Sequence, residues 1–257
     1  MKNDLPLNLL RAEHKASEII ERYGIAAPEH IQVEDIAFAL GVTVVERTLF
    51  GAAASLVRSG KSATIRVPPD ERYPERKRFS IAHELGHFIL KHGFSLRLLC
   101  TEEAMFDWHQ NSGQESEANF FAGELLLPRN LIKDRCDVKE VNFKPIAKIA
   151  KDFSTSLTAT AIRFVRFCPE MCALVFSKDS QITWFYKSEN WWPYIPKGPL
   201  DINTFACNFF RGLEVPDEPF EVDGDAWVEN NGVDSIVEHS ICSPRLGFVL
   251  SILWIKS

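Results

Sequence analysis

Residues 79–90 read Phe-Ser-Ile-Ala-His-Glu-Leu-Gly-His-Phe-Ile-Leu, and they carry a His-Glu-x-x-His motif from His83 to His87. Pro74 can begin the helix around this motif, because the first helical residue needs no backbone N–H, and the pattern predicts a helix to about His92. A spacing of four puts both imidazoles on one helix face, about one turn apart. Two imidazoles in this arrangement can bind one tetrahedral zinc ion, so the stretch predicts a metal centre.

Apolar residues surround this helix on every side between Ile81 and Leu90, which predicts that the helix is buried. His83, Glu84 and His87 then enter the interior as polar groups. Burying each polar group without a hydrogen-bond partner would lower the stability of the fold by on the order of 1 to 3 kcal/mol, and burying a carboxylate would lower it more. A metal ion with its water satisfies all three groups. In the alternative interpretation, the same groups bond to neighbouring backbone or carboxylates.

A catalytic zinc ion of this kind needs a third protein ligand and an open position for water. The candidates, Glu115 and Glu117, lie on a helix predicted for residues 114–127, which Pro128 ends. On a helical wheel both acids border the apolar arc of this helix. Helix geometry alone therefore leaves the choice between them open.

Two segments together resemble the ImmA/IrrE family of zinc metallopeptidases: FSIAHELGHFILKH at 79–92 and ESEANFFAGELLLP at 115–128. The run VEDIAFALGVTVVE at 33–46 and the basic stretch before the motif also match the order found in that family. The resemblance covers roughly residues 5–167. In the family, the glutamate immediately before Ala-Asn completes the metal site, so the resemblance implies that Glu117 is the third ligand.

The expected chemistry is peptide hydrolysis. Zinc brings the pKa of its bound water toward neutrality, and we expect Glu84 to act as the general base that takes a proton from this water. Manganese could replace zinc in such a site.

Other polar residues have candidate roles that the sequence does not place in space. Candidates to donate a hydrogen bond to the oxyanion are Tyr73, His109 and His239. Asn119, or Glu115 if it is not a ligand, could orient a metal ligand through a hydrogen bond. His92 follows His87 by five residues and is expected to turn away from the ligand face.

Composition limits the classes of protein that fit. The chain has 257 residues, 46% of them hydrophobic, and a net charge of -6, so it repels a phosphate backbone. Residues 1–10 are too interrupted for a signal peptide, and the longest apolar run, 247–255, is about half of the roughly 20 residues that span a membrane. The six cysteines contain no CxxC pair, as expected of reduced thiols. We expect a cytoplasmic protein with no membrane partner.

Periodicity and turn residues predict an α+β fold. Helices are expected at 9–23, 33–40, 74–92, 114–127, 143–153, 155–167 and 203–211. Strands are expected at 42–45, 54–58, 64–67, 173–177, 182–186, 234–240 and 247–255. We expect a mainly helical zincin-like peptidase domain with a small sheet at 1–140, a helix-turn-helix-like segment at 141–167, and an α/β domain at 168–257.

The helix-turn-helix-like segment offers few side chains that could read bases beyond Arg163 and Arg166. We therefore expect these helices to pack on the peptidase domain, without direct DNA binding. IrrE-type members join a peptidase domain through such a segment to a GAF-like sensor. The resemblance implies that residues 168–257 form a GAF-like regulatory domain.

The leading hypothesis is a zinc-dependent endopeptidase that cleaves a protein inside the cell. The family resemblance suggests that the substrate is a helix-turn-helix repressor or antitoxin of a stress, phage or mobile-element system, whose cleavage relieves repression. One alternative is a DNA-binding or sensor regulator with a structural or vestigial metal site. Another is an interaction module that inhibits its partner only by binding.

Overall fold

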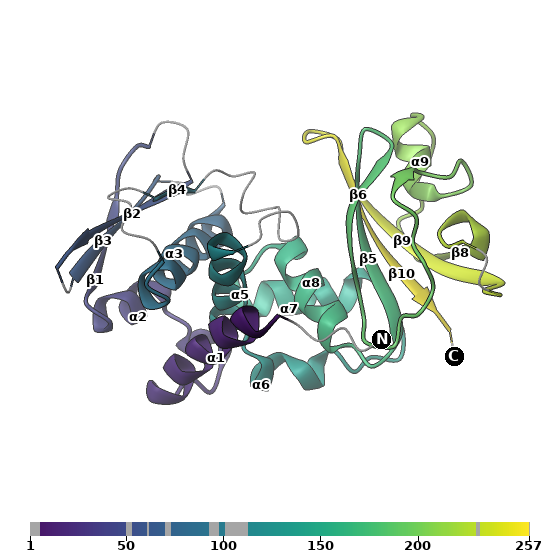
Figure 1. Cartoon of the computed structure of the whole chain (residues 1–257). Coiled ribbons are helices and arrows are strands. Elements are labelled where there is room, and N and C mark those ends of the chain that lie inside the picture. Colours follow the sequence, from purple (N-terminus) through teal and green to yellow (C-terminus); the bar gives the residue numbers. More distant parts are fainter. Residues whose placement is uncertain are drawn as a thin grey trace. The chain divides into compact units, whose positions relative to one another are not determined.

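The computed structural model describes residues 6–49, 53–60, 62–69, 73–92, 98–100, 113–229 and 232–256. These residues form two compact units (Figure 1). The N-terminal unit contains the chain up to residue 131 together with 150–156, and the C-terminal unit contains 132–149 and the chain from 157 onward. In the described part of the chain, no helix is both long enough and apolar enough to cross a membrane.

The N-terminal unit combines helices with a four-stranded sheet. Its elements are α1 (Leu7–Arg22), α2 (Val33–Ala39), β1 (Val42–Glu46), β2 (Ala54–Ser59), β3 (Ser62–Val67), α3 (Pro74–Ile89), β4 (Leu98–Cys100), α5 (Gln114–Leu126) and α6 (Arg129–Ile132). The strand order is β1-β3-β2-β4, in which β1 is parallel to β3 and the other pairs are antiparallel. Helix α3 packs against β2 and β3 and against α5, while α1 packs against α5 (Figure 1).

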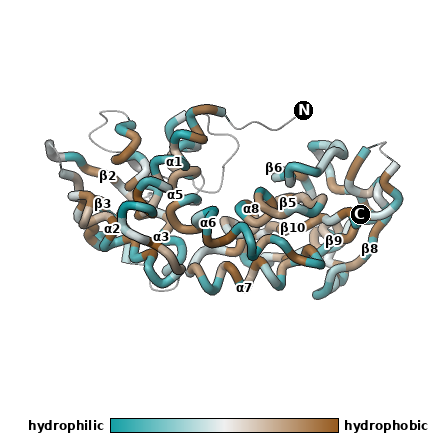
Figure 2. The backbone as a smooth tube through the Cα atoms, turned by 90° about the horizontal axis from the view of Figure 1, so that it is seen from below, coloured by the Kyte–Doolittle hydropathy of each residue, from teal (hydrophilic) through white to brown (hydrophobic). Residues whose placement is uncertain are grey.

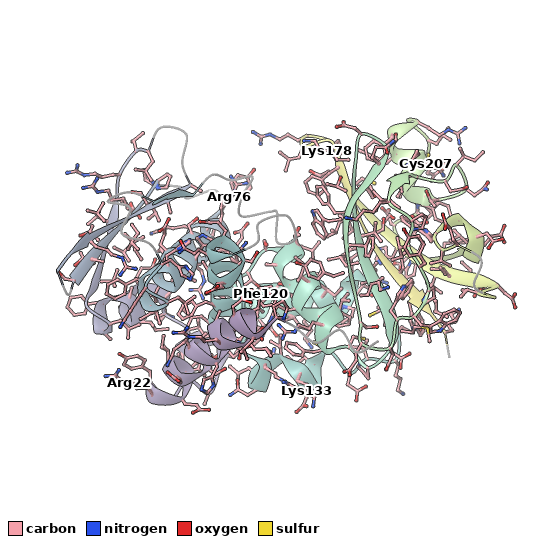
Figure 3. All side chains as sticks on the ribbon, viewed as in Figure 1. Arg22, Arg76, Phe120, Lys133, Lys178 and Cys207 are labelled. Atoms are coloured by element: carbon pink, nitrogen blue, oxygen red, sulfur yellow. The ribbon has the colours of Figure 1, made fainter. Side chains whose placement is uncertain are left out.

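Helix α3 is buried, as the apolar residues around the motif predicted. Pro74 is its first residue, and every residue from Ser80 to His87 is buried. Helix α5, on which Phe120 is labelled in Figure 3, is buried almost throughout from Ser116 to Leu126. The polar side chains on two such buried helices need partners within the protein or on a bound group.

The C-terminal unit is built on a six-stranded antiparallel sheet. Its elements are α7 (Phe143–Phe153, whose last turn lies in the N-terminal unit), α8 (Leu157–Phe167), β5 (Met171–Lys178), β6 (Gln181–Lys187), β7 (Gly198–Pro199), α9 (Phe205–Phe210), β8 (Phe220–Asp223), β9 (Ser235–Ser243) and β10 (Phe248–Ile255). The strand order is β7-β6-β5-β10-β9-β8. The core of this unit includes Val175, Trp191, Trp227, Ile236 and Leu253.

A buried carboxylate links α9 to the sheet. Glu238 on β9 accepts hydrogen bonds from the backbone N–H groups of Phe205 and Ala206, at 3.1 and 2.8 Å, and from Trp227 Nε1 at 2.8 Å. Burial raises the pKa of Glu238, while these hydrogen bonds act in the opposite direction. Its bonding capacity is used within the unit, so Glu238 has a structural role.

The helices α7 and α8 form the predicted pair, and hydrophobic and hydrophilic residues alternate along α7 (Figure 2). Helix α8 belongs to the C-terminal unit and packs against β5 and β6, and the expected packing of the pair on the peptidase domain stays a prediction. Residues 160–165 are buried, and Arg163 is only 2% exposed, with its guanidinium over the ring of Phe167. The helix that would read bases therefore presents little of its surface to DNA.

The predicted α+β class is confirmed, with a peptidase-like unit followed by a sheet domain. The elements that the pattern missed are short, such as β4, β7 and β8, because two to four residues cannot display a period. The compact units divide the chain near residue 131, whereas the prediction placed divisions at 140 and 167. The GAF-like and regulatory assignment of 168–257 stays a prediction.

Candidate metal centre

Helix α3 brings the two motif histidines together at one buried point. His83 and His87 are both 0% exposed, and their Nε2 atoms lie 3.0 Å apart. Residues four apart on a helix lie on the same face, and this face of α3 points toward α5. The predicted pairing of these imidazoles is therefore present in the fold.

Helix α5 adds a carboxylate to this pair. Glu115 Oε2 lies 3.2 Å from His83 Nε2, and Oε1 lies 3.4 Å from His87 Nε2. In a tetrahedral zinc site with bonds of about 2.0 to 2.1 Å, the ligand atoms are about 3.3 Å from one another. The three side chains thus have the spacing of a metal site, and among the described residues they form the group that could hold an ion.

The structure brings Glu115, rather than the predicted Glu117, to the two imidazoles. Glu117 Oε2 instead lies 3.0 Å from His92 Nε2, and Asn8 Nδ2 donates to Glu117 Oε1 at 3.0 Å. Two residues along a helix are separated by about 200° of rotation, so one helix cannot aim both acids at the same point. The orientation of α5 against α3 selects Glu115.

Asn119 lies one turn beyond Glu115 and determines the tautomer of His83. Asn119 Oδ1 lies 2.8 Å from His83 Nδ1, and both side chains are buried. A carbonyl oxygen only accepts, so Nδ1 of His83 carries a hydrogen, and Nε2 is the nitrogen left to bind a metal ion. The candidate role of Asn119 in orienting a ligand therefore has a definite geometry.

The charge states suit a divalent cation. Burial lowers the pKa of His87, which favours a neutral ring there. Hydrogen bonds from His83 and then His87 hold the pKa of Glu115 well below its usual range, so this carboxylate is ionised. A metal ion can take the place of the hydrogens between the two imidazoles and the carboxylate, so the residues fit a zinc ion.

The two helices that carry this site lie in a part of the chain that matches a known family. A model of the M78 peptidase family, described as the IrrE N-terminal-like domain, matches residues 38–165, about half of the chain. The chain carries an IrrE N-terminal-like domain. A solved structure described as a Mycobacterium tuberculosis transcriptional regulator has a similar fold, with a TM-score of 0.59 and 15% identity over 97% of this chain and 81% of that one. No curated protein matches the sequence.

Gly86 lets the two helices of the IrrE-like domain approach closely. A Cβ atom at this position would lie 3.1 Å from Phe121 Cδ1 and 3.2 Å from the Cα atom of Ala118. The second contact is with backbone, which cannot rotate away. The glycine in the middle of the motif thus allows α5 to bring Glu115 and Asn119 within reach of the imidazoles.

Arg58 contacts the end of α3 beside the candidate metal centre, and the sequence did not predict this contact. From β2 its Nη2 atom donates to the carbonyl oxygens of His87 at 2.6 Å and Phe88 at 3.3 Å, and its guanidinium lies over the Phe88 ring. A cation at a helix C-terminus satisfies the last carbonyls and interacts favourably with the helix dipole. Along the sequence, one arginine in a short strand gives no sign of this contact.

His92 lies against His87, which corrects the expectation that it turns away. The helix ends at Ile89, and Lys91 has a left-handed φ of 58°. His92 N–H then bonds to His87 O at 3.1 Å, and Lys91 N–H to Phe88 O at 3.3 Å, which is the Schellman pattern of a helix end. This turn brings His92 Nδ1 to 3.0 Å from His87 Nδ1.

The remaining catalytic candidates differ in where the structure places them. Glu84 is on α3 between the two histidines and is 0% exposed. Tyr73 precedes α3, about 15 Å along the axis from His83, and Arg76 lies over its ring, so the structure does not bring it to the centre. His239 belongs to β9 of the C-terminal unit, where Nδ1 accepts from the N–H of Phe143. His109 lies outside the described residues.

Proposed function

We propose that the IrrE-like domain is a zinc-dependent endopeptidase in which His83, His87 and Glu115 hold the metal. One observation carries the proposal: two imidazoles and a carboxylate present three ligand atoms to one point at separations of 3.0 to 3.4 Å. Two histidines and a glutamate leave the fourth position of a tetrahedral zinc ion open. An open position distinguishes a catalytic site from a structural one.

Glu84 is the general base in this proposal. Zinc held by two imidazoles and a carboxylate supplies a Lewis acid that makes water nucleophilic near neutral pH. The Glu84 carboxylate accepts the proton of the attacking water and delivers it to the leaving amine. Because Glu84 is completely buried, its proton transfer takes place away from bulk solvent. Manganese is the alternative metal for the same ligands.

The proposed substrate is a helix-turn-helix repressor or antitoxin, and its cleavage relieves repression. Support comes from the resemblance of the sequence to the ImmA/IrrE family and from the match to the IrrE N-terminal-like model. The net charge of -6 and the burial of Arg163 on α8 favour a protein substrate over direct DNA binding.

The test compares the full chain with its Glu84→Gln variant. Each is expressed with the helix-turn-helix repressor encoded nearest to its gene, and repressor fragments and zinc content are measured. We expect the wild type to cut the repressor, whereas Glu84→Gln binds zinc as the wild type does and leaves the repressor whole. His83→Ala and Glu115→Ala should lose both zinc and cleavage.

Glu75→Gln is the matched control, because it makes the same chemical change in the first turn of α3. It should retain both properties. Full cleavage by Glu84→Gln would remove the mechanism. An uncut repressor that remains bound to the wild type would favour the interaction module, and salt-dependent binding to operator DNA in a gel-shift assay would favour the DNA-binding regulator.

A further inference from the structure

A chain of polar contacts leads away from the metal centre on the His87 side. His87 Nδ1 lies 3.0 Å from His92 Nδ1, and His92 Nε2 lies 3.0 Å from Glu117 Oε2. His92 is 5% exposed, and the side chain of Glu117 is 20% exposed. Three segments supply these groups: α3, the turn after it, and α5.

The direction of these hydrogen bonds follows from the carboxylate of Glu117. A carboxylate oxygen accepts, so His92 Nε2 donates to Glu117 Oε2. His92 Nδ1 is then the acceptor in the contact with His87 Nδ1, which donates. This leaves Nε2 of His87, the atom that faces His83 and Glu115, to bind a metal ion.

Each ligand histidine therefore has its own acceptor. His83 donates to the amide oxygen of Asn119. His87 donates to His92, which in turn donates to the carboxylate of Glu117. An acceptor on the outer nitrogen holds the imidazole ring in place and makes the inner nitrogen a better ligand. The backbone helps, because the Schellman turn brings His92 to His87.

We propose that His92 and Glu117 are positioning residues that hold His87 in the metal-binding tautomer and so set the affinity for zinc. The inference rests on the proposed metal site. It also gives Glu117 a role at the centre other than that of a ligand.

Zinc affinity of the full chain, measured by competition with a chelator, tests the proposal without any substrate. We expect His92→Ala and Glu117→Ala to bind zinc about 10- to 100-fold more weakly than the wild type. His92→Asn should recover most of the affinity, because its amide oxygen can stand where Nδ1 stood and accept from His87. The double variant should bind no more weakly than His92→Ala, since both changes break one chain of contacts.

Asn8→Ala is the matched control. It removes the other hydrogen bond of Glu117, between exposed groups, and leaves the chain to His87 intact. Its zinc affinity should equal that of the wild type. Thermal unfolding in excess chelator shows whether each variant folds, and Glu117→Gln, which keeps an acceptor for His92, provides a milder change with a smaller loss.

The outcomes separate this inference from the proposed function. If the wild type binds zinc, His83→Ala does not, and His92→Ala and Glu117→Ala match the wild type, the positioning role is overturned while the metal site stands. Equal weakening by His92→Asn and His92→Ala would also overturn it, because the acceptor would then be irrelevant. If the wild type binds no zinc, the proposed function and this inference fail together.

Discussion

At the scale of single residues, two glutamates on one turn of α5 have different partners. Glu115 faces both motif histidines, whereas Glu117 faces His92 and Asn8. Both acids border the apolar arc of the helix, so burial pattern does not separate them. In the proposed site, Glu115 is a ligand and Glu117 acts through a neighbouring histidine. This distinction depends on which part of α3 each acid meets.

A second residue-scale feature gives a pH dependence outside the metal centre. His239 Nδ1 accepts from the N–H of Phe143, and Nε2 donates to the carbonyl oxygen of Asp217. Protonation would put a hydrogen on Nδ1 against another N–H. Burial accordingly lowers the pKa of His239, although Glu218 and Asp217 act to raise it and Lys144 to lower it.

The sign of the effect on stability follows from proton binding. The unfolded chain binds more protons than the folded one at pH values between the lowered pKa and 6.5, the ordinary value for histidine. The contribution of His239 is therefore complete above pH 6.5 and is lost as the pH falls through its lowered pKa.

We predict that the C-terminal unit becomes less stable between about pH 7.5 and about pH 5.5. Urea unfolding followed by tryptophan fluorescence measures this, because all the tryptophans in the described residues lie in this unit. His239→Asn, which can still accept from Phe143 but does not titrate, should show a smaller pH dependence. An identical pH dependence in both proteins would contradict the assignment.

At the scale of elements, the metal centre depends on how closely α3 and α5 pack. The Cβ atom that Gly86→Ala adds would lie 3.2 Å from the Cα atom of Ala118, so the helices must separate by a few tenths of an ångström. This movement takes Glu115 away from the imidazoles. We predict a loss of stability of about 1 to 3 kcal/mol and zinc binding weakened about 10-fold or more.

Ala82→Gly is the matched control for Gly86→Ala. It lowers helix propensity by about 1 kcal/mol on the same helix and adds no atom between the helices. Chemical denaturation and chelator competition measure stability and zinc affinity in both variants. If Gly86→Ala and Ala82→Gly lose the same stability and also the same zinc affinity, the spacing between the helices is not the cause of the weaker zinc binding.

At the scale of the whole molecule, the three proposed metal ligands all come from one of the two compact units. Zinc should therefore stabilise the N-terminal unit by about 2.7 kcal/mol when its free concentration is 100 times the dissociation constant. Circular dichroism reports mainly on the helices of that unit, and tryptophan fluorescence reports mainly on the C-terminal unit, to which five of the six tryptophans belong.

We predict that a chelator lowers the midpoint of thermal unfolding seen by circular dichroism more than the midpoint seen by fluorescence. His83→Ala should not respond to the chelator at all. A chelator effect of the same size in His83→Ala would mean that the stabilising ion binds elsewhere.

The sequence by itself determined the motif helix, its burial, the α+β class and the pairing of His83 with His87. These features follow from spacings of a few residues and from hydrophobic periodicity, which are local properties of a helix. Only the tertiary structure decided between Glu115 and Glu117, because that choice depends on the rotation of α5 against α3. It also decided the place of His92. Lys91, which has a left-handed backbone conformation, ends the helix and turns the chain so that His92 contacts His87, whereas a continued helix would have separated them.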